Sequence, residues 1–385
     1  MDTQGTPLRS PLHEEHLSLN ASMTEFGGYL MPVQYSGIIP EHLAVRKAAG
    51  LFDTSHMGEF LVRGKGAGAF LQGMLTNDVR KCAPGTALYT AMCLPSGGTV
   101  DDLYIYNITG MGWPSPSKGE AYMLVVNAAN TAKDLTWLTA ALKGVRDATL
   151  TDVSAEVAML ALQGPKAEEI LQALTRMDCA GLRRFSTAVA EVAGARMLVS
   201  RTGYTGEDGF ELYFSPKQAG KVWRTILDAG KPHGLLPAGL GSRDTLRLEA
   251  CYPLYGHELD ERTSPVEGGI GWAVSEKDIL CMGCDVLLKE KREGARRELV
   301  AFEMRERAIP RKGYPLLVAG RIVGEVTSGT HSPLFNKGIG LALAERGTCR
   351  PGDAVTLTIR ERDAAAVVVK KPFYAYAGRN QKRWT

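Results

Sequence analysis

The sequence lacks long hydrophobic runs, a strong charge imbalance and a dense set of cysteines. Its 385 residues contain no apolar run near the roughly 18 residues that a membrane-spanning helix needs. The net charge of +3, from 45 Lys and Arg against 42 Asp and Glu, gives no general case for a nucleic-acid-binding protein. An apolar fraction of 44% excludes a disordered chain. We therefore expect a globular protein of two or three domains with no membrane or nucleic-acid partner.

The cysteines are few, and the first residues do not have the pattern of a leader peptide. Seven cysteines are spread thinly, which argues against a disulfide framework and favours a reducing compartment. Cys281 and Cys284 form a single C-x-x-C pattern, and we interpret them as incidental thiols because no second pair follows at zinc-ribbon spacing. The first 25 residues hold one arginine, four acidic residues and no apolar core, which is unlike a secretory or transit peptide.

Several catalytic and nucleotide-binding motifs are missing. The chain has no P-loop, no His-Glu-x-x-His and no G-x-S-x-G elbow. Gly64-Lys-Gly-Ala-Gly68 is spaced G-x-G-x-G instead of the dinucleotide fingerprint G-x-G-x-x-G, so we predict a structural turn there. His13 and His16 stand near the start of the chain, where we predict a surface pair and no metal site.

The sequence contains an internal repeat. Residues 60–72 align without gaps on residues 160–172, and both segments have the pattern of a strand, a glycine turn and a helix. The identical pairs are Gly64/Gly164, Ala67/Ala167, Leu71/Leu171 and Gln72/Gln172. Many strand–helix turns look alike, but this repeat favours two related α+β lobes.

The chain after about residue 285 has a different sequence pattern from the part before it. Residues 286–297 are rich in charge and typical of a helix or linker, and short strands then alternate with glycine and proline turns. The predicted strands are 299–304, 314–318, 321–327, 339–344, 354–359 and 365–369. We predict a catalytic region of two interleaved α+β lobes at 1–284, a linker at 285–298 and a C-terminal β-barrel domain at 299–385.

Two stretches carry carboxylates on predicted strands. Residues 97–106 place Asp101 and Asp102 at a strand start, where neighbours face opposite sides and only one can point into a given pocket. A polar turn that caps the strand is the simpler interpretation. In residues 201–213, Glu211 stands among aromatic residues. Glu211 is either an ordinary polar residue at the edge of a strand or the anchor for a ligand. The ligand would then carry a planar, amidine-like group that donates two parallel N–H bonds to the carboxylate.

Two further stretches carry basic groups. Arg243 falls in the first turn of a helix that opens near Ser242, where the helix dipole disfavours a cation, although Asp244 is placed to pair with it. His56 is a lone histidine in residues 53–57, and such a histidine is more often a hydrogen-bonded structural residue than a base. Neither position decides a function by itself.

Taken together, the four stretches resemble the T-protein (aminomethyltransferase) family of the glycine cleavage system, whose members use tetrahydrofolate. The resemblance runs from residue 6 to residue 373, and the number, order and spacing of its landmarks make it specific. The landmarks include Leu51-Phe-Asp-Thr-Ser-His-Met57, Gly97-Gly-Thr-Val-Asp-Asp102, Leu162-Gln-Gly-Pro165, Arg201-Thr-Gly-Tyr-Thr-Gly-Glu-Asp-Gly209 and Arg243-Asp-Thr-Leu-Arg-Leu-Glu249. The chain departs from the family at residues 279–284, where only Gly283 of the usual Phe-x-Gly-Lys pattern persists.

The resemblance implies an α+β cloverleaf of three domains around a central folate channel, with two related ferredoxin-like lobes and a C-terminal β-barrel. It implies transfer of the one-carbon unit from aminomethyl-lipoyl H-protein to tetrahydrofolate, with release of ammonia. The products are 5,10-methylenetetrahydrofolate and dihydrolipoyl H-protein. Tetrahydrofolate is then a co-substrate, the lipoyl H-protein is the partner, and no metal takes part. The location follows the host: mitochondrial matrix in a eukaryote, cytoplasm in a bacterium.

The resemblance also implies roles for particular residues. Asp102 matches the family's essential aspartate, Glu211 its pterin anchor, and Arg243 a second folate contact. Positions that match the lining of the folate cleft are Asn127, Tyr204 and Tyr106, with Met57 as one apolar wall.

Three alternatives remain open. A tetrahydrofolate-dependent demethylase that acts on a small methyl donor has the same fold, folate site and aspartate. Folate-binding relatives that assist iron–sulfur protein maturation carry a cysteine where this chain has Tyr204, which argues against them. A structural or interaction protein with a dead folate pocket is disfavoured, because Asp102, Glu211 and Arg243 are all intact.

Overall fold

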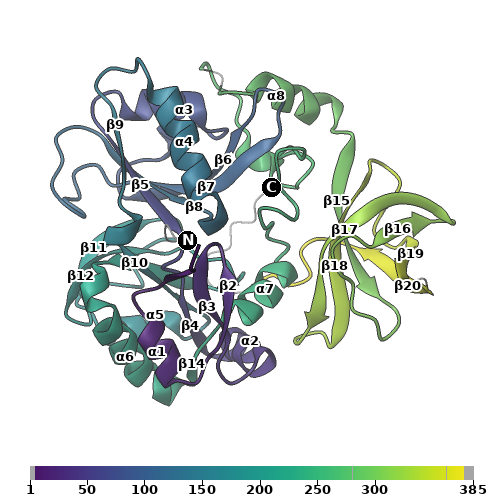
Figure 1. Cartoon of the computed structure of the whole chain (residues 1–385), viewed down its shortest axis with the longest axis horizontal. Coiled ribbons are helices and arrows are strands. Elements are labelled where there is room, and N and C mark those ends of the chain that lie inside the picture. Colours follow the sequence, from purple (N-terminus) through teal and green to yellow (C-terminus); the bar gives the residue numbers. More distant parts are fainter. Residues whose placement is uncertain (1–4, 280, 361, 377–385) are drawn as a thin grey trace.

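The computed structural model describes residues 5–279, 281–360 and 362–376. Two layered lobes lie against each other, and a separate barrel lies to one side of them (Figure 1). Helix α8 (Cys284–Glu293) leads from the lobes to the barrel, in the segment where the sequence predicted a helix or linker. Within the described residues, no helix is both long and apolar enough to cross a membrane.

The first lobe is a five-stranded antiparallel sheet with helices on its outer face. Its strand order is β6-β7-β8-β5-β9. Phe60 and Val62 point into the core beneath the helices, whereas Leu61 points to the other face, as the two-residue period of a strand requires. The elements are β5 (Gly58–Arg63), β6 (Thr86–Cys93), β7 (Thr99–Asn107), β8 (Ala121–Val126), β9 (Thr149–Asp152), α3 (Ala67–Met74) and α4 (Thr131–Leu142).

The second lobe repeats this plan with a six-stranded sheet in the order β11-β12-β13-β10-β4-β14. Leu160 and Leu162 enter its helix-covered core, and Met159 faces the opposite side. The elements are β4 (Ala49–Asp53), β10 (Ala158–Gln163), β11 (Thr187–Val192), β12 (Ala195–Ser200), β13 (Gly209–Phe214), β14 (Leu235–Pro237), α5 (Ala167–Gln172) and α6 (Ala219–Gly230).

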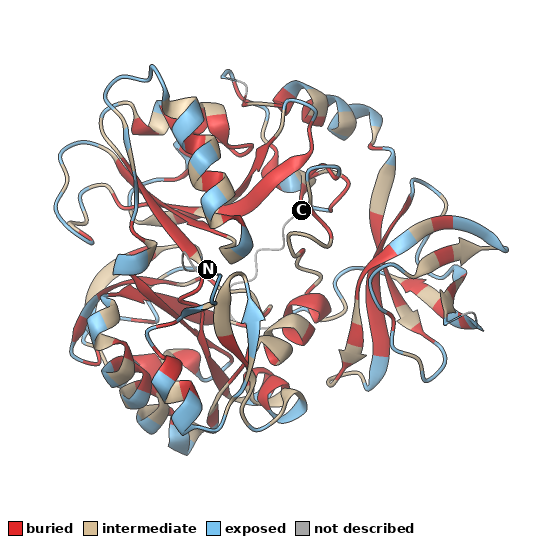
Figure 2. Cartoon of the chain, viewed as in Figure 1, coloured by how far each residue is buried: buried red, intermediate tan, exposed pale blue. Residues whose placement is uncertain are grey.

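The inner faces of the two sheets pack against each other, so the lobes form four layers: helix, sheet, sheet, helix. One apolar cluster joins Tyr106 and Met123 of the first sheet to Met159, Leu198 and Tyr213 of the second. Figure 2 shows buried residues along the strands and exposed residues on the outer sides of the helices. Polar groups on these inner faces therefore lie between the lobes, in a layer with little access to water.

The lobes exchange a strand. β4 directly precedes β5 in the chain but pairs with β10 of the second lobe, where Asp53 lies opposite Leu160. β9 directly precedes β10 but pairs with β5 of the first lobe, where Asp152 lies opposite Phe60. Each sheet thus contains a strand that leads into the other lobe, which ties the two sheets together across the inner layer.

The repeated segments form the same structure in both lobes. Gly64 and Gly164 have φ values of 124° and 130°, and a Cβ atom at these positions would lie 2.0 Å from Asp147 O and 2.6 Å from Ala48 O. Only glycine fits such a turn, so the predicted structural turn is confirmed. Seven residues beyond the glutamine of each repeat, a backbone N–H donates to its Oε1: Val79 to Gln72 at 2.8 Å and Cys179 to Gln172 at 3.0 Å.

This pair of glutamines provides a matched test of the repeat. We expect Gln72→Leu to lower the free energy of unfolding by about 1–3 kcal/mol, because Gln72 is buried and the Val79 N–H then loses its acceptor away from water. Gln172→Leu should cost less, since Gln172 is exposed and water can replace the bond. Urea unfolding of both variants measures the difference; equal losses would contradict this account.

The N-terminal segment forms a small sheet of order β1-β3-β2 and is anchored by buried polar groups. The elements are β1 (Leu8–Arg9), α1 (His13–Ser18), β2 (Ser22–Phe26), β3 (Tyr29–Gln34) and α2 (Ile38–Lys47). His13 and His16 are both buried, so the predicted surface pair is wrong. His16 Nε2 lies 2.8 Å from Asp53 Oδ2 and its Nδ1 lies 2.9 Å from the Tyr35 hydroxyl, contacts that the local sequence does not reveal.

The C-terminal strands close into a six-stranded barrel, which leaves no exposed sheet edge. All six strands predicted from the sequence are present. They are β15 (Arg297–Met304), β16 (Pro315–Val318), β17 (Arg321–Ser332), β18 (Lys337–Glu345), β19 (Ala354–Ile359) and β20 (Arg362–Val369). Helix α7 (Leu240–Glu249) links the barrel to the lobes, since its Leu248 packs among barrel residues Leu299 and Leu341.

One expectation about the cysteines is wrong. Cys281 and Cys284 form a disulfide at the start of α8, where we predicted incidental thiols. Their Cα atoms lie 5.1 Å apart, and the positive φ of Gly283 between them turns the chain so that the two side chains meet. The spacing alone did not distinguish this pair from two free thiols. The other cysteines are free.

Candidate functional site

Strand β7 brings polar side chains into the layer between the sheets. Asp102, Tyr104 and Tyr106 alternate onto its inner face, and Asp101 is directed toward the side covered by α4. At about 3.3 Å per residue, Asp102 and Tyr106 are separated by roughly 13 Å along the strand. A ligand that reaches both ends must therefore be elongated.

Asp102 is held by two donors. The Tyr89 hydroxyl donates to Oδ2 at 2.7 Å, and the side-chain amide of Asn127 donates to Oδ1 at 3.1 Å. Burial, and next the charge of Asp101, raises the pKa of Asp102 to about 7. A carboxyl group with this pKa is suited to gain or lose a proton at neutral pH.

Glu211 lies on the second sheet, opposite Tyr106. Its Oε2 accepts bonds from the hydroxyls of Thr202 at 2.5 Å, Tyr106 at 3.1 Å and Tyr213 at 3.4 Å. Within the part of the chain that the structure describes, no hydrogen bond reaches Oε1. Three hydroxyls therefore fix the carboxylate by one oxygen and leave the other available to a donor from outside the protein.

Arg243, in the first turn of α7, is a second group without a full set of partners. Among the described residues nothing accepts a bond from its buried Nη1, and its guanidinium carbon lies 4.7 Å from the centre of the Tyr204 ring. Asp244 does not pair with it, because Asp244 binds Arg247 at 2.8 Å instead. Burial lowers the pKa of Arg243, but an arginine remains charged at neutral pH. A cation with a buried, unpartnered nitrogen favours an acceptor supplied by a ligand.

His56 lies close to this cation. Burial, and then the charge of Arg243, lowers the pKa of His56 to about 4, so its imidazole is neutral at physiological pH. No described residue bonds to its Nδ1, so the predicted hydrogen-bonded role is wrong for that nitrogen. Its ring packs edge-on against Phe26 of the N-terminal sheet, at 5.6 Å between centroids.

Aromatic rings line the inner face beside Asp102. Tyr89 stacks on Trp272 at 5.4 Å and meets Tyr104 edge-on at 5.3 Å, and Tyr104 stacks on Phe185 at 6.3 Å. Such a row offers a flat, apolar surface to a planar ligand. Trp272 is about half exposed, at 47%, so the row extends from the buried layer to the protein surface.

The structure brings the predicted site residues together in three groups. Tyr106 bonds to Glu211, Asn127 bonds to Asp102, and the Tyr204 ring lies over Arg243. Met57 packs in the apolar cluster between the sheets. No hydrogen bond among the described residues joins Asp102 directly to Glu211.

Sequence reasoning missed the residues that support these groups, Tyr89, Thr202, Tyr213 and Asp134. Tyr89 lies on β6, directly opposite Tyr104 of β7, and the sequence analysis did not assign β6. A signal for this strand was present, because residues 86–93 are a short, mostly apolar run typical of a buried strand. Of the hydroxyl partners of Glu211, Tyr213 lies on the same strand and Thr202 in the loop before it, but their contact with the carboxylate could be found only from the folded structure.

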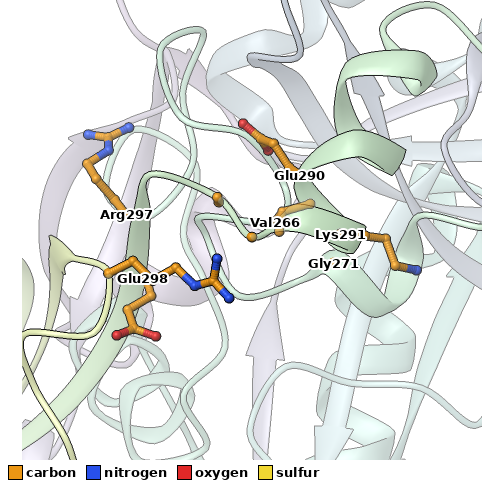
Figure 3. A pocket seen from close by; sticks show the side chains of 9 residues that line it. Val266, Gly271, Glu290, Lys291, Arg297 and Glu298 are labelled. Atoms are coloured by element: carbon orange, nitrogen blue, oxygen red, sulfur yellow. The ribbon is translucent and has the colours of Figure 1, made fainter.

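A separate hollow is lined by none of these residues. It has a volume of about 320 Å3 and is lined by residues of α8 and by Arg297 and Glu298 at the start of β15 (Figure 3). Its charged groups are already paired, since Arg297 binds Glu267 at 2.7 Å and Lys291 donates to Val274 O at 2.6 Å. Among the described residues, no cluster of His, Cys, Asp or Glu side chains is arranged to hold a metal ion.

Comparison with known proteins decides the family. The family described as "GCVT N-terminal domain" matches residues 12–278, more than half of the chain. The chain belongs to the glycine cleavage T-protein family. The description "Glycine cleavage T-protein C-terminal barrel domain" matches residues 297–375, the segment that forms the barrel.

Relatives in this family match over nearly the whole chain. An aminomethyltransferase of Geobacillus kaustophilus (strain HTA426) is 53% identical over 372 residues, which cover 96% of this chain and 99% of that protein. One of Bacillus subtilis (strain 168) is 48% identical over 369 residues, covering 95% and 99%. The crystal structure of glycine cleavage system aminomethyltransferase T from Bartonella henselae has a TM-score of 0.85 and 29% identity, covering 95% of this chain and 98% of that one. The predicted fold class is confirmed.

Proposed function

We propose that the protein is an aminomethyltransferase that transfers the one-carbon unit of aminomethyl-lipoyl H-protein to tetrahydrofolate. One observation carries the proposal: among the described residues, no hydrogen bond reaches Oε1 of the buried Glu211 or the buried Nη1 of Arg243, and both groups lie near the layer that holds Asp102. The names of the relatives support the same activity. Ammonia, 5,10-methylenetetrahydrofolate and dihydrolipoyl H-protein are the products.

In the proposed reaction the carbon leaves the sulfur and the amine nitrogen of the donor and becomes bonded to N5 and N10 of the folate. The two protons lost from N5 and N10 leave with ammonia and the thiol, so atoms and charge balance. Asp102 orients N10, holds a proton during the transfer and stabilises the cationic iminium that forms as a bond to the carbon breaks. Its pKa of about 7 suits both the protonated and the ionised role.

Glu211 anchors the pterin in this proposal. Its free Oε1 accepts from the N3–H and 2-amino group, while the three hydroxyls keep the carboxylate in place. Arg243 provides a second polar contact to the folate, and Tyr204 supports its guanidinium. Tyr106, Asn127 and Met57 line the cleft, and the row of rings beside Tyr89 supplies its flat wall.

The remaining parts of the proposal concern organisation and location. Residues 1–284 form the catalytic region, 285–298 the linker and 299–385 the barrel domain. The lipoyl H-protein is the macromolecular partner, with no nucleic acid and no membrane involved. Because the relatives named above are bacterial, we favour the cytoplasm over the mitochondrial matrix.

The proposed activity is tested by measuring product formation from purified aminomethylated H-protein. Aminomethylated H-protein and tetrahydrofolate are mixed with the protein, and ammonia and methylenetetrahydrofolate are followed together. We expect both products in equal amounts. Folate binding without turnover, combined with methyl transfer from a small free donor, would contradict the proposal and favour the demethylase.

A further inference from the structure

Behind Asp102 lies a second pair of carboxyl groups that the proposed reaction does not use. Asp101 of β7 and Asp134 of α4 are both fully buried, with no exposed surface. Each carboxyl group lies close enough to the other to affect its pKa, and neither oxygen of Asp134 has a hydrogen-bond donor among the described residues. Two ionised carboxylates cannot share such a contact away from water, so one of them carries a proton.

The donors around the pair identify Asp101 as the ionised member. Its Oδ1 accepts from the side-chain amides of Asn130 at 2.6 Å and Asn127 at 2.9 Å, and its Oδ2 accepts from the Asn127 backbone N–H at 3.0 Å. Three N–H donors stabilise the negative form of a carboxylate. A proton on Asp134 acts in the same direction, against the burial that raises the pKa of Asp101.

Asp134 is in the opposite situation. Apart from its contact with Asp101, neither of its carboxyl oxygens has a hydrogen-bond partner among the described residues. The neighbouring cation does not compensate, because Lys133 Nζ donates to Val100 O and to the Tyr255 hydroxyl, both at 2.6 Å. Burial, followed by the charge of Asp101, raises the pKa of Asp134 to about 11, so its proton remains bound at neutral pH.

Asn127 connects this pair to Asp102. One side-chain amide nitrogen, Asn127 Nδ2, donates to Asp101 Oδ1 at 2.9 Å and to Asp102 Oδ1 at 3.1 Å. The backbone also links them, since Asp101 and Asp102 are adjacent on β7. The position of the amide, and the charge felt by Asp102, therefore depend on Asp101.

We propose that Asp134 and Asp101 share one buried proton, and that this pair holds Asn127 in place and controls the protonation of Asp102. Both are positioning residues, because they act through Asn127 and through charge without touching the substrate. The proposal rests on the role proposed for Asp102 only in its kinetic part, whereas the buried proton itself can be observed without any activity.

The groups that face Asp102 come from several elements. They are Tyr89 of β6, Asp101 and Tyr104 of β7, Asp134 of α4, and Tyr204 of the loop before β13. The tyrosines are neutral at physiological pH, because burial raises the pKa of each. Asp101 is therefore the charged neighbour whose removal should change Asp102 most.

Infrared spectroscopy tests the proton directly. A protonated carboxylic acid has a C=O stretch that is resolved from carboxylate and amide bands. We expect the wild-type protein at neutral pH to show this band and Asp134→Asn to lose part of it, because Glu59, whose pKa is raised by burial, and Asp102, with a pKa of about 7, contribute to the band in both proteins. A wild-type band no larger than that of folded Asp134→Asn would overturn the shared proton whether or not the protein is an aminomethyltransferase.

The pH dependence of kcat/KM tests the control of Asp102. If Asp102 acts as a base, activity falls as the pH drops through its pKa of about 7. Removal of a like charge lowers that pKa, so Asp101→Asn should move the acid limb to lower pH by about one unit. Asp134→Asn keeps a neutral donor to Asp101 and should retain the wild-type limb.

The two variants have different expected outcomes, a shifted acid limb for Asp101→Asn and an unchanged one for Asp134→Asn, so each serves as the control for the other. An unchanged limb in folded Asp101→Asn, or an equal shift in both variants, would overturn the control of Asp102. If Asp101→Asn does not fold, the limb of Asp134→Asn and the infrared band decide. Loss of all turnover in the wild-type protein would instead refute the proposed function and leave the infrared result standing.

Discussion

Replacement of Asp102 by asparagine should lower kcat by about 10²–10⁴-fold, the usual contribution of a positioned acid or base. The substitution removes the charge and the titrating proton but little volume, and the new amide can still accept from Asn127 through its oxygen and donate to the Tyr89 hydroxyl through its NH2 group. Tetrahydrofolate affinity should change much less, because Glu211 and Arg243 remain. Single-turnover rates and equilibrium folate binding measure the two effects separately.

Asp147→Asn is the matched control for this variant. Asp147 is exposed and has a φ of 62°, a conformation that asparagine tolerates, so the same chemical change occurs far from the inner layer. It should have wild-type kinetics. Near-normal turnover in Asp102→Asn would show that another group provides the acid–base step, and parallel loss of folate binding would show that Asp102 is a binding residue.

Replacement of Glu211 by glutamine should weaken folate binding by about 2–3 kcal/mol, or roughly 30- to 150-fold. Glutamine keeps an oxygen for the hydroxyls of Thr202, Tyr106 and Tyr213, but it turns an NH2 group toward the N–H donors of the pterin. The lost bonds act in the ground and transition states alike, so kcat at saturating folate should fall less than the affinity.

Glutamine is a sharper choice than alanine here. Glu211→Ala leaves three buried hydroxyls without their acceptor, and a loss of stability would then be confused with a loss of binding. Glu191→Gln, at an exposed position of β11, is the control, and thermal unfolding confirms that each variant is folded. Unchanged folate affinity in Glu211→Gln would eliminate the anchor role.

Short-range patterns in the sequence were sufficient for much of the fold. The six barrel strands are separated by glycine and proline turns, and each was found from its own residues. The segments at 60–72 and 160–172 became β5–α3 and β10–α5 because a glycine with positive φ is needed at the same place in both. Strand β7 was found too, but which of Asp101 and Asp102 faces the cleft depended on how the sheet packs.

Short-range sequence patterns could not predict which distant strands pair with each other. The exchange of β4 and β9 between the lobes joins segments about one hundred residues apart, and no local signal distinguishes it from two separate sheets. The disulfide between Cys281 and Cys284 and the burial of His16 were missed because both depend on surroundings that the local sequence does not contain.

The sequence by itself determined the family, the class of each domain and the identity of the residues that we propose for catalysis and folate binding, because these follow from residue type and spacing along the chain. Only the tertiary structure decided how those residues are supported. The hydroxyls that hold Glu211, the tyrosine that bonds Asp102 and the carboxyl pair behind it come from different strands and helices. Their effects arise from burial and close contact, which exist only once the two sheets have packed together.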